Sequence, residues 1–176
     1  NALRAAYQLE QRGAQIDLYF TDTDASEQEL ARTIHAHFYP LNGNVFRYRG
    51  SIEPCDVLFA THWSTVQPAL DNRDSAGELM YFVQDFEPLF YPMGSEYLLA
   101  ENTYRKGLYH ITTGPWCEGI LRTRFGAEAD HFQFPIDTST YFPRARTNPR
   151  KRILFFAKPE MARRCFTLGA EAIAQL

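Results

Sequence analysis

Short apolar runs alternate with amphipathic stretches along most of this 176-residue sequence. Asp56 to Ala60 and Leu79 to Val83 have the length and composition of buried strands, and each precedes a stretch with helical spacing. A regular alternation of strand and helix builds a parallel sheet with helices on its faces. Because 45% of the residues are apolar, the chain has enough material for one full hydrophobic core. The pattern therefore predicts an α/β fold.

Several local signals predict where elements begin and end. Gly13 and Gly126 favour the left-handed conformation that ends a helix, Pro115 suits a first helical position, and Ser26 with Glu29 forms a capping box. We expect strands at 15–20, 45–49, 56–60, 79–83, 109–112 and 153–157, and helices at 2–12, 26–38, 64–70, 96–106, 115–125 and 160–176.

Residues 135–152 have the composition of a linker, with three prolines and five basic residues. They separate a first domain at 1–134 from the start of a second domain at 153–176. One strand and one helix cannot bury their own apolar faces, so the second domain should continue beyond this sequence. The first domain begins inside a helix, whereas such domains normally begin with a strand. We therefore expect a central strand before residue 1 and a segment of a longer polypeptide.

The charge of the chain is unevenly distributed. The formal net charge is −3, yet the residues from Arg144 onward carry eight basic side chains against two acidic ones. A positive segment on an otherwise acidic chain fits an anionic ligand such as a phosphate, and it equally fits a solvated tail. Nucleic acid is not an expected partner, because the rest of the chain is acidic and aromatic residues do not alternate with the basic ones at 144–164.

The sequence also argues against a membrane span and a metal site. It has no run of about eighteen apolar residues and no signal-peptide pattern, so a cytoplasmic protein is the default expectation. The three cysteines match no metal or disulfide spacing. Asp22 and Asp24 resemble a metal-binding Asp-x-Asp pair, but two aspartates in a turn after a strand are common, and we expect no metal.

Several segments resemble family 4 of the retaining glycosyltransferases. The Phe134–Thr138 segment with Tyr141-Phe142-Pro143 resembles that family's crossing between two lobes, and Arg12–Leu18 and Phe59–Trp63 resemble earlier strand passages. The block Tyr81–Pro88 is more specific, and it is similar to the branch that builds bacterial rhamnan and surface-layer glycans. The resemblance implies the GT-B architecture: a Rossmann-like acceptor-side lobe, then the first strand and helix of a second, donor-binding lobe.

The same resemblance implies an activity. A sugar would pass from a nucleotide diphosphate sugar, with dTDP-rhamnose as the candidate, to a glycan or lipid-linked glycan acceptor during surface polysaccharide synthesis. Transfer would be retaining and metal-independent, with no cofactor, at the inner face of the membrane and with peripheral membrane association. The remainder of the parent chain would be required, so this segment alone should be inactive. Phe134-Pro135-Ile136 departs from the usual Asn-Gly-Val, and Lys158 replaces the usual arginine.

Four residues are candidates for binding the donor. Lys158, Arg163 and Arg164 follow a predicted strand and could stabilise charge on a diphosphate leaving group, or they could form a solvated basic helix face. His62 follows another predicted strand at the carboxyl end, where α/β sheets bind ligands. The resemblance implies that it contacts the donor sugar or phosphate, and the alternative is a hydrogen-bonded structural histidine.

Four residues are candidates for binding the acceptor: Gln84, Asp85, Glu87 and Tyr91. They lie in an aromatic stretch after a predicted strand, where carboxylates accept sugar hydroxyl hydrogens and rings stack on sugar faces. Asp85 or Glu87 is the candidate catalytic base, although in retaining transferases the leaving phosphate can take the acceptor proton. The alternative is a core segment followed by polar loop residues.

Two further expectations concern the site as a whole. Thr112 and Thr113 precede a predicted helix, and we expect their hydroxyls to cap it rather than to bind an anion. The strand ends before His62, Gln84 and Lys158 should converge on one cleft. The competing function is a non-catalytic carbohydrate- or nucleotide-binding domain with the same fold.

Overall fold

The computed structural model describes residues 2–133, 136–145, 147 and 149–176, in two compact units. The first unit spans residues 1–133 and the second 134–176. The Phe134-Pro135 part of the predicted lobe-crossing motif lies outside the described residues.

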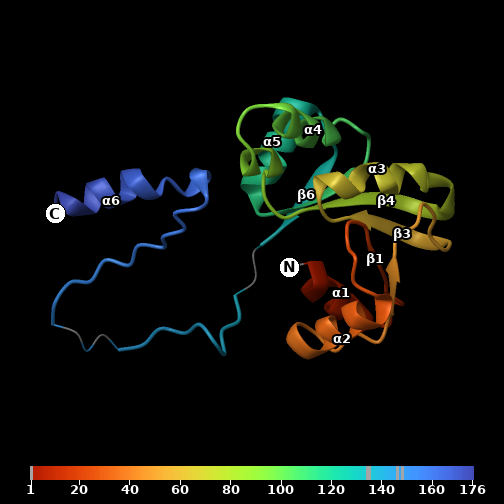
Figure 1. Ribbon diagram of the computed structural model, residues 1–176, viewed down its shortest axis with the longest axis horizontal. Coiled ribbons are helices and arrows are strands. Elements are labelled where there is room, and N and C mark those ends of the chain that lie inside the picture. Colours follow the sequence, from red (N-terminus) through yellow and green to blue (C-terminus); the bar gives the residue numbers. More distant parts are fainter. Residues whose placement is uncertain (1, 134–135, 146, 148) are drawn as a thin grey trace. The chain divides into compact units, whose positions relative to one another are not determined.

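The first unit is built on parallel sheets flanked by helices (Figure 1), so the predicted Rossmann-like α/β class is confirmed. Four strands form a sheet in the order β3-β4-β5-β6, and two others form the pair β1-β2. All neighbouring strands are parallel. The strands are β1 (Asp17–Phe20), β2 (Asn44–Arg47), β3 (Cys55–Ala60), β4 (Ala76–Val83), β5 (Tyr109–Thr113) and β6 (Ala129–Phe132).

The helices of the first unit follow the predicted order. The α-helices are α1 (Ala2–Glu10), α2 (Glu27–His37), α3 (Trp63–Asp71), α4 (Ser95–Thr103) and α5 (Pro115–Phe125), with 3-10 turns η1 (Arg73–Ser75) and η2 (Glu87–Phe90). Helices α3, α4 and α5 lie on the same face of the four-stranded sheet (Figure 1), as right-handed crossovers along one direction require. The main core lies between them and the sheet, and it includes Val66, Tyr81, Tyr104 and Leu121.

Three of the local signals have the predicted geometry. The Ser26 hydroxyl accepts from the Glu29 amide at 3.3 Å, and the Glu29 carboxylate accepts from the Ser26 amide at 2.8 Å, so the capping box is confirmed. Pro115 is the first residue of α5. Gly126 ends that helix with φ 62°, a left-handed conformation that glycine adopts at little cost.

Two features of the first unit were not predicted. Strand β6 is not predicted, because Asp130 and His131 interrupt its apolar pattern and it is the edge strand of the sheet. The strands also form two separate sheets. Within the described residues, β1 pairs only with β2, and β3, at the edge of the other sheet, pairs only with β4. The central strand that we expect before residue 1 stays a prediction.

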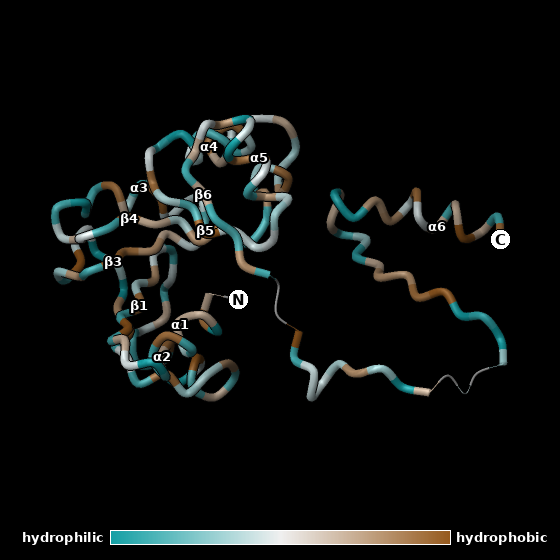
Figure 2. The backbone as a smooth tube through the Cα atoms, turned by 180° about the vertical axis from the view of Figure 1, so that it is seen from behind, coloured by the Kyte–Doolittle hydropathy of each residue, from teal (hydrophilic) through white to brown (hydrophobic). Residues whose placement is uncertain are grey.

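The second unit contains less regular structure than predicted. Residues 153–157 form no strand, because strands require a neighbour to pair with and the described part of this unit offers none. The stretch is apolar (brown in Figure 2), and Leu154 is 93% exposed. The predicted helix at 160–176 is also shorter, because Cys165 is left-handed at φ 50° and separates the 3-10 turn η3 (Ala162–Arg164) from α6 (Phe166–Ala174).

Local contacts nevertheless organise the second unit. The rings of Phe155 and Phe166 stack at 5.8 Å. Gly169 packs against the Phe155 ring, where an added Cβ would come within 2.5 Å of a ring atom. In the described residues of the predicted linker, the Asp137 carboxylate accepts from the Ser139 amide at 3.0 Å, which forms a local turn.

Candidate functional site

The carboxyl ends of β3 and β4 bring two predicted site residues together. The strands are parallel neighbours, with Ala60 opposite Tyr81 in the register, so both chains leave the sheet at the same edge. His62 and Gln84 follow these strand ends, and the Gln84 side-chain amide donates to the Thr61 carbonyl at 3.4 Å. Ligands of open α/β sheets bind at this edge. Two of the three strand ends predicted to converge therefore meet.

His62 is held by the start of α3, for which it is the N-cap residue. Its Nδ1 accepts from the Ser64 amide at 3.4 Å and lies 2.9 Å from the Ser64 hydroxyl. The Thr65 hydroxyl accepts from the His62 amide and donates back to the His62 carbonyl. Because Nδ1 accepts, the proton of the neutral ring lies on Nε2. Burial lowers the pKa of His62, which keeps the ring neutral and makes Nε2–H a donor at neutral pH.

Glu87 is a buried carboxyl group, only 2% exposed, that joins three elements. Its Oε2 accepts from the Tyr81 hydroxyl at 2.7 Å and from the Trp63 amide at 2.6 Å. Its own amide donates to the Tyr104 hydroxyl at 3.1 Å. Desolvation raises the pKa of Glu87 to about 7, against the opposing effect of these hydrogen bonds. The arrangement fixes η2 against β4, α4 and the start of α3.

Asp85 and Tyr91 lie on either side of Glu87 in the same loop, and both are half-buried. The Asp85 carboxylate accepts from the Phe86 amide at 2.8 Å. The Tyr91 hydroxyl accepts from the Trp63 indole N–H at 2.9 Å. Gln84, Asp85, Glu87 and Tyr91 therefore belong to one loop that is fastened to the residue after His62.

Trp63 is the residue that sequence reasoning missed. It contacts Glu87 through its backbone and Tyr91 through its side chain, and its ring lies 5.6 Å from that of His62. The available signal was its position, an aromatic residue directly after a polar residue at a strand end.

The expectation that a threonine hydroxyl caps α5 is wrong. Gly114 is the N-cap residue with φ 79°, and no described side chain caps the helix. The Thr112 hydroxyl donates to the Gly114 carbonyl at 3.2 Å instead. Because Gly114 turns the backbone in the left-handed region, the hydroxyls before it do not reach the first helical amides.

This chain is similar to a known protein family and to a known protein. Residues 41–113 match the family described as "WsaF, N-terminal domain". The O-antigen biosynthesis protein RfbC of Myxococcus xanthus is 37% identical over 125 residues, which is 69% of this chain and 10% of that protein. Residues 41–113 are a WsaF-like segment. The chain spans about a tenth of the length of its RfbC relative. The WsaF-like segment contains His62, Gln84, Asp85, Glu87 and Tyr91.

The basic donor-site candidates lie outside the WsaF-like segment, in the second unit. The Lys158 ammonium lies 5.9 Å and the Arg164 guanidinium 5.8 Å from the centre of the Phe156 ring. Arg163 and Arg164 belong to η3 and not to the first turn of a long helix, so their predicted placement is corrected. Their convergence with His62 and Gln84 stays a prediction.

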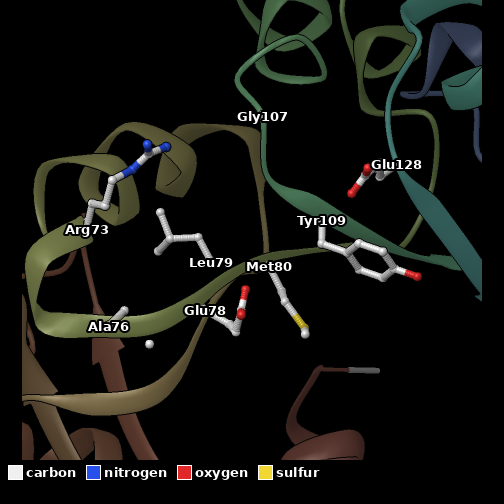
Figure 3. Close-up of a pocket in the computed structure, with 9 residues that line it drawn as sticks. Arg73, Ala76, Glu78, Leu79, Met80, Gly107, Tyr109 and Glu128 are labelled. Atoms are coloured by element: carbon white, nitrogen blue, oxygen red, sulfur yellow. The ribbon is translucent and has the colours of Figure 1, made fainter.

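A surface depression of about 420 Å³ lies at the opposite edge of the sheet. It is lined by the amino ends of β4 and β5, including Glu78 and Tyr109, together with Arg73 and Glu128 (Figure 3). Its position differs from the carboxyl edge where α/β sheets bind their ligands, so we do not assign the candidate site to it. Among the described residues, no group of three or more His, Cys, Asp or Glu side chains is placed to hold a metal ion.

The described residues also bear on the relation to membranes. None of the helices in that part of the chain combines the length and the hydropathy needed to cross a bilayer.

Proposed function

We propose that this chain is the acceptor-side part of a GT-B glycosyltransferase that acts in bacterial surface polysaccharide synthesis. The observation that carries the proposal is the hydrogen bond from the Gln84 amide to the carbonyl of Thr61, the residue before His62, at the carboxyl edge of a parallel sheet and inside the WsaF-like segment. The similarity to an O-antigen biosynthesis protein supports the same role. The activity belongs to the whole parent protein, with the cytoplasmic face of the membrane as its place of action and peripheral association with that surface.

The proposed reaction transfers a sugar from a nucleotide diphosphate sugar, with dTDP-rhamnose as the first donor to test. The His62 Nε2–H donates to oxygens of the donor sugar at the edge of the sheet, and the Gln84 amide donates to oxygens of the acceptor. Lys158, Arg163 and Arg164 stabilise the negative charge that develops on the departing diphosphate, so that no metal or other cofactor is needed. Transfer retains the anomeric configuration, and the acceptor proton passes to the leaving phosphate or to Asp85.

Glu87 is less suited than Asp85 to take that proton. It is buried and already accepts two hydrogen bonds on one oxygen, whereas the Asp85 side chain is half-exposed. A base must reach the acceptor hydroxyl directly or through one water. The geometry therefore favours a positioning role for Glu87.

The direct test is to incubate the full-length parent protein with a panel of nucleotide sugars and a lipid-linked glycan acceptor. Transfer from at least one donor, unaffected by EDTA, is the expected result. Product analysis by NMR then gives the anomeric configuration. Failure to transfer or hydrolyse any donor would refute the proposal.

Two substitutions test the assignment of the donor site. Lys158→Ala and Arg163→Ala should each weaken donor binding by roughly 1–3 kcal/mol, the range for charge-assisted contacts. Lys151→Ala, in the predicted linker, is the matched control and should leave donor affinity unchanged. Unaltered affinity in both Lys158→Ala and Arg163→Ala would remove these residues from the site.

A second candidate is a non-catalytic carbohydrate- or nucleotide-binding domain. The burial of Glu87, one of only two candidate bases, favours it. Saturable binding of a saccharide or nucleotide by a parent protein that transfers no sugar would identify this second function.

A further inference from the structure

Four aromatic rings follow one another at the carboxyl ends of β3 and β4. The centres of the His62 and Trp63 rings are 5.6 Å apart, those of Trp63 and Tyr91 5.9 Å, and those of Tyr91 and Phe90 6.5 Å. We call these residues the aromatic row. Its members come from the start of α3 and from the end of η2, which are separated in sequence and contact each other at the sheet edge.

The aromatic row is partly exposed and is not a continuation of the core. Phe90 is 40% exposed, and the side chains of His62, Trp63 and Tyr91 are half-buried. The core aromatic residues nearby, Tyr81 and Tyr104, are at most 1% exposed. Aromatic side chains at a ligand-binding edge that keep exposed surface are typical of binding sites, because the core gains little from them.

Hydrogen bonds also hold the aromatic row in place. The buried Glu87 carboxylate accepts from the Trp63 amide at 2.6 Å, and the Trp63 indole donates to the Tyr91 hydroxyl at 2.9 Å. The Trp63 and Tyr91 rings meet edge to face, at an interplanar angle of 88°. Rings that are positioned before a ligand arrives lose little conformational entropy on binding, which favours affinity.

The polar groups along the row suit hydroxyl-rich ligands. The Tyr91 hydroxyl accepts from the indole, which leaves its own hydrogen able to donate. The His62 Nε2–H and the Gln84 amide lie at the same edge. The sequence from Leu89 to Ser95 contains no charged residue, which fits a neutral ligand better than a phosphate.

We propose that the aromatic row is a saccharide subsite that binds the acceptor glycan, with Trp63 and Tyr91 stacking on sugar faces and Gln84 binding sugar hydroxyls. The subsite deepens the proposed function and rests on it for the identity of the glycan as acceptor. Trp63 is the new residue in this assignment, and Glu87 is its positioning residue.

The experiment uses the fact that the chain contains two tryptophans, Trp63 and Trp116. In the Trp116→Phe variant of the 176-residue chain, all tryptophan fluorescence comes from Trp63. The probes are a panel of neutral oligosaccharides released from bacterial O-antigens and other surface polysaccharides, and dTDP as a nucleotide probe. We expect saturable quenching or a spectral shift of Trp63 with at least one oligosaccharide, and no response to dTDP.

Variants then test which rings bind the saccharide, with affinity measured by calorimetry. Trp63→Ala and Tyr91→Ala should each weaken oligosaccharide binding by about tenfold, as expected for the loss of one aromatic contact. Tyr91→Phe keeps the ring and should weaken binding less than Tyr91→Ala. Phe38→Ala is the matched control, because Phe38 is 60% exposed but belongs to the end of α2, and it should bind as the unaltered chain does.

Each outcome decides the proposal. No binding of any oligosaccharide, unchanged affinity in Tyr91→Ala, or a Trp63 response to dTDP alone would overturn it. If Trp63→Ala fails to fold, as judged by circular dichroism, Trp63→Phe and Tyr91→Ala carry the test. The binding experiment is separate from the transfer assay, so a protein that binds glycan but transfers no sugar refutes the proposed enzyme and keeps the subsite. An active enzyme whose glycan affinity is unchanged in Tyr91→Ala refutes the subsite and keeps the proposed enzyme.

Discussion

Two nearly matching apolar runs behave differently in this protein. Asp56 to Ala60 forms most of β3, whereas Ile153 to Ala157, of the same length and similar composition, forms no strand. The first run pairs with β4 and packs under α3, and the second has no pairing strand among the described residues of its unit. Local sequence thus predicts which residues are able to form a strand, and a hydrogen-bonding neighbour decides whether they do.

The largest expected effect on stability comes from replacing one leucine in each of the two units. Leu121 is 0% exposed in the first unit and Leu154 is 93% exposed in the second. Leu121→Ala should lower the free energy of unfolding by about 2–5 kcal/mol, through lost burial and a cavity. Leu154→Ala should change it by less than about 0.5 kcal/mol. Chemical denaturation of both variants measures the difference, and equal losses would mean that Leu154 is buried in solution.

The next largest effect on stability is expected from replacing Glu87, in the first unit. In Glu87→Ala the Tyr81 hydroxyl and the Trp63 amide lose their buried acceptor, which should cost about 2–4 kcal/mol of stability. Glu87→Gln keeps a carbonyl oxygen and should cost less. Exposed Glu160 in the second unit is the control, and Glu160→Ala should be nearly neutral. A Glu87→Ala protein with an unchanged denaturation midpoint would contradict the buried network.

The pH dependence of stability separates a buried carboxyl group from an exposed one. The folded-state pKa of Glu87 is raised to about 7, so its contribution to stability is fully present below about pH 4.5, the ordinary pKa of this side chain, and is lost as the pH rises through 7. The loss should be on the order of 3 kcal/mol at most. His110, whose pKa burial lowers, acts with the opposite sign: its contribution is present above pH 6.5 and is lost as the pH falls.

The measurement compares the unaltered chain with Glu87→Gln by denaturation between pH 5 and pH 8. The difference isolates Glu87, because the His110 contribution is common to both proteins. We expect the unaltered chain to lose stability relative to Glu87→Gln as the pH rises. Asp137→Asn is the exposed comparison: serine and threonine hydrogen bonds lower the pKa of Asp137, which lies on the surface of the second unit. Parallel pH profiles for the unaltered chain and Glu87→Gln would show that Glu87 is ionised in the folded state at pH 5.

The same contrast explains how far the sequence predicts the fold. The apolar runs at 56–60 and 79–83 and the cap at Ser26 carry enough local information to place their elements. The edge strand β6 was missed, because its Asp130 and His131 are stabilised by pairing with β5 and not by an apolar pattern. The strand at 153–157 was wrongly predicted for the converse reason.

The candidate site was predictable to a similar extent. His62 and Gln84 were found because strand ends are visible in the sequence and parallel strands share an edge. The burial of Glu87 and the role of Trp63 were not, because both depend on contacts between loops about 24 residues apart in sequence. A polar residue after a strand looks the same in sequence whether it faces solvent or lies beneath the loop.

The smallest expected effect on stability comes from substitutions at the starts of two helices, one in each unit. The Ser26 hydroxyl caps α2 by accepting from the Glu29 amide, and the Ser26 amide donates to the Glu29 carboxylate, whereas Cys165 precedes α6 without a side-chain cap in the described structure. Ser26→Ala should therefore cost about 1 kcal/mol, while Cys165→Ala should be close to neutral. The first change removes an acceptor from a helical amide, and the second removes a thiol that accepts from none. Thermal unfolding of the two variants measures the contrast. A Cys165→Ala loss as large as that of Ser26→Ala would mean that α6 depends on its first residue as α2 does, and the two units would then differ in strand pairing alone.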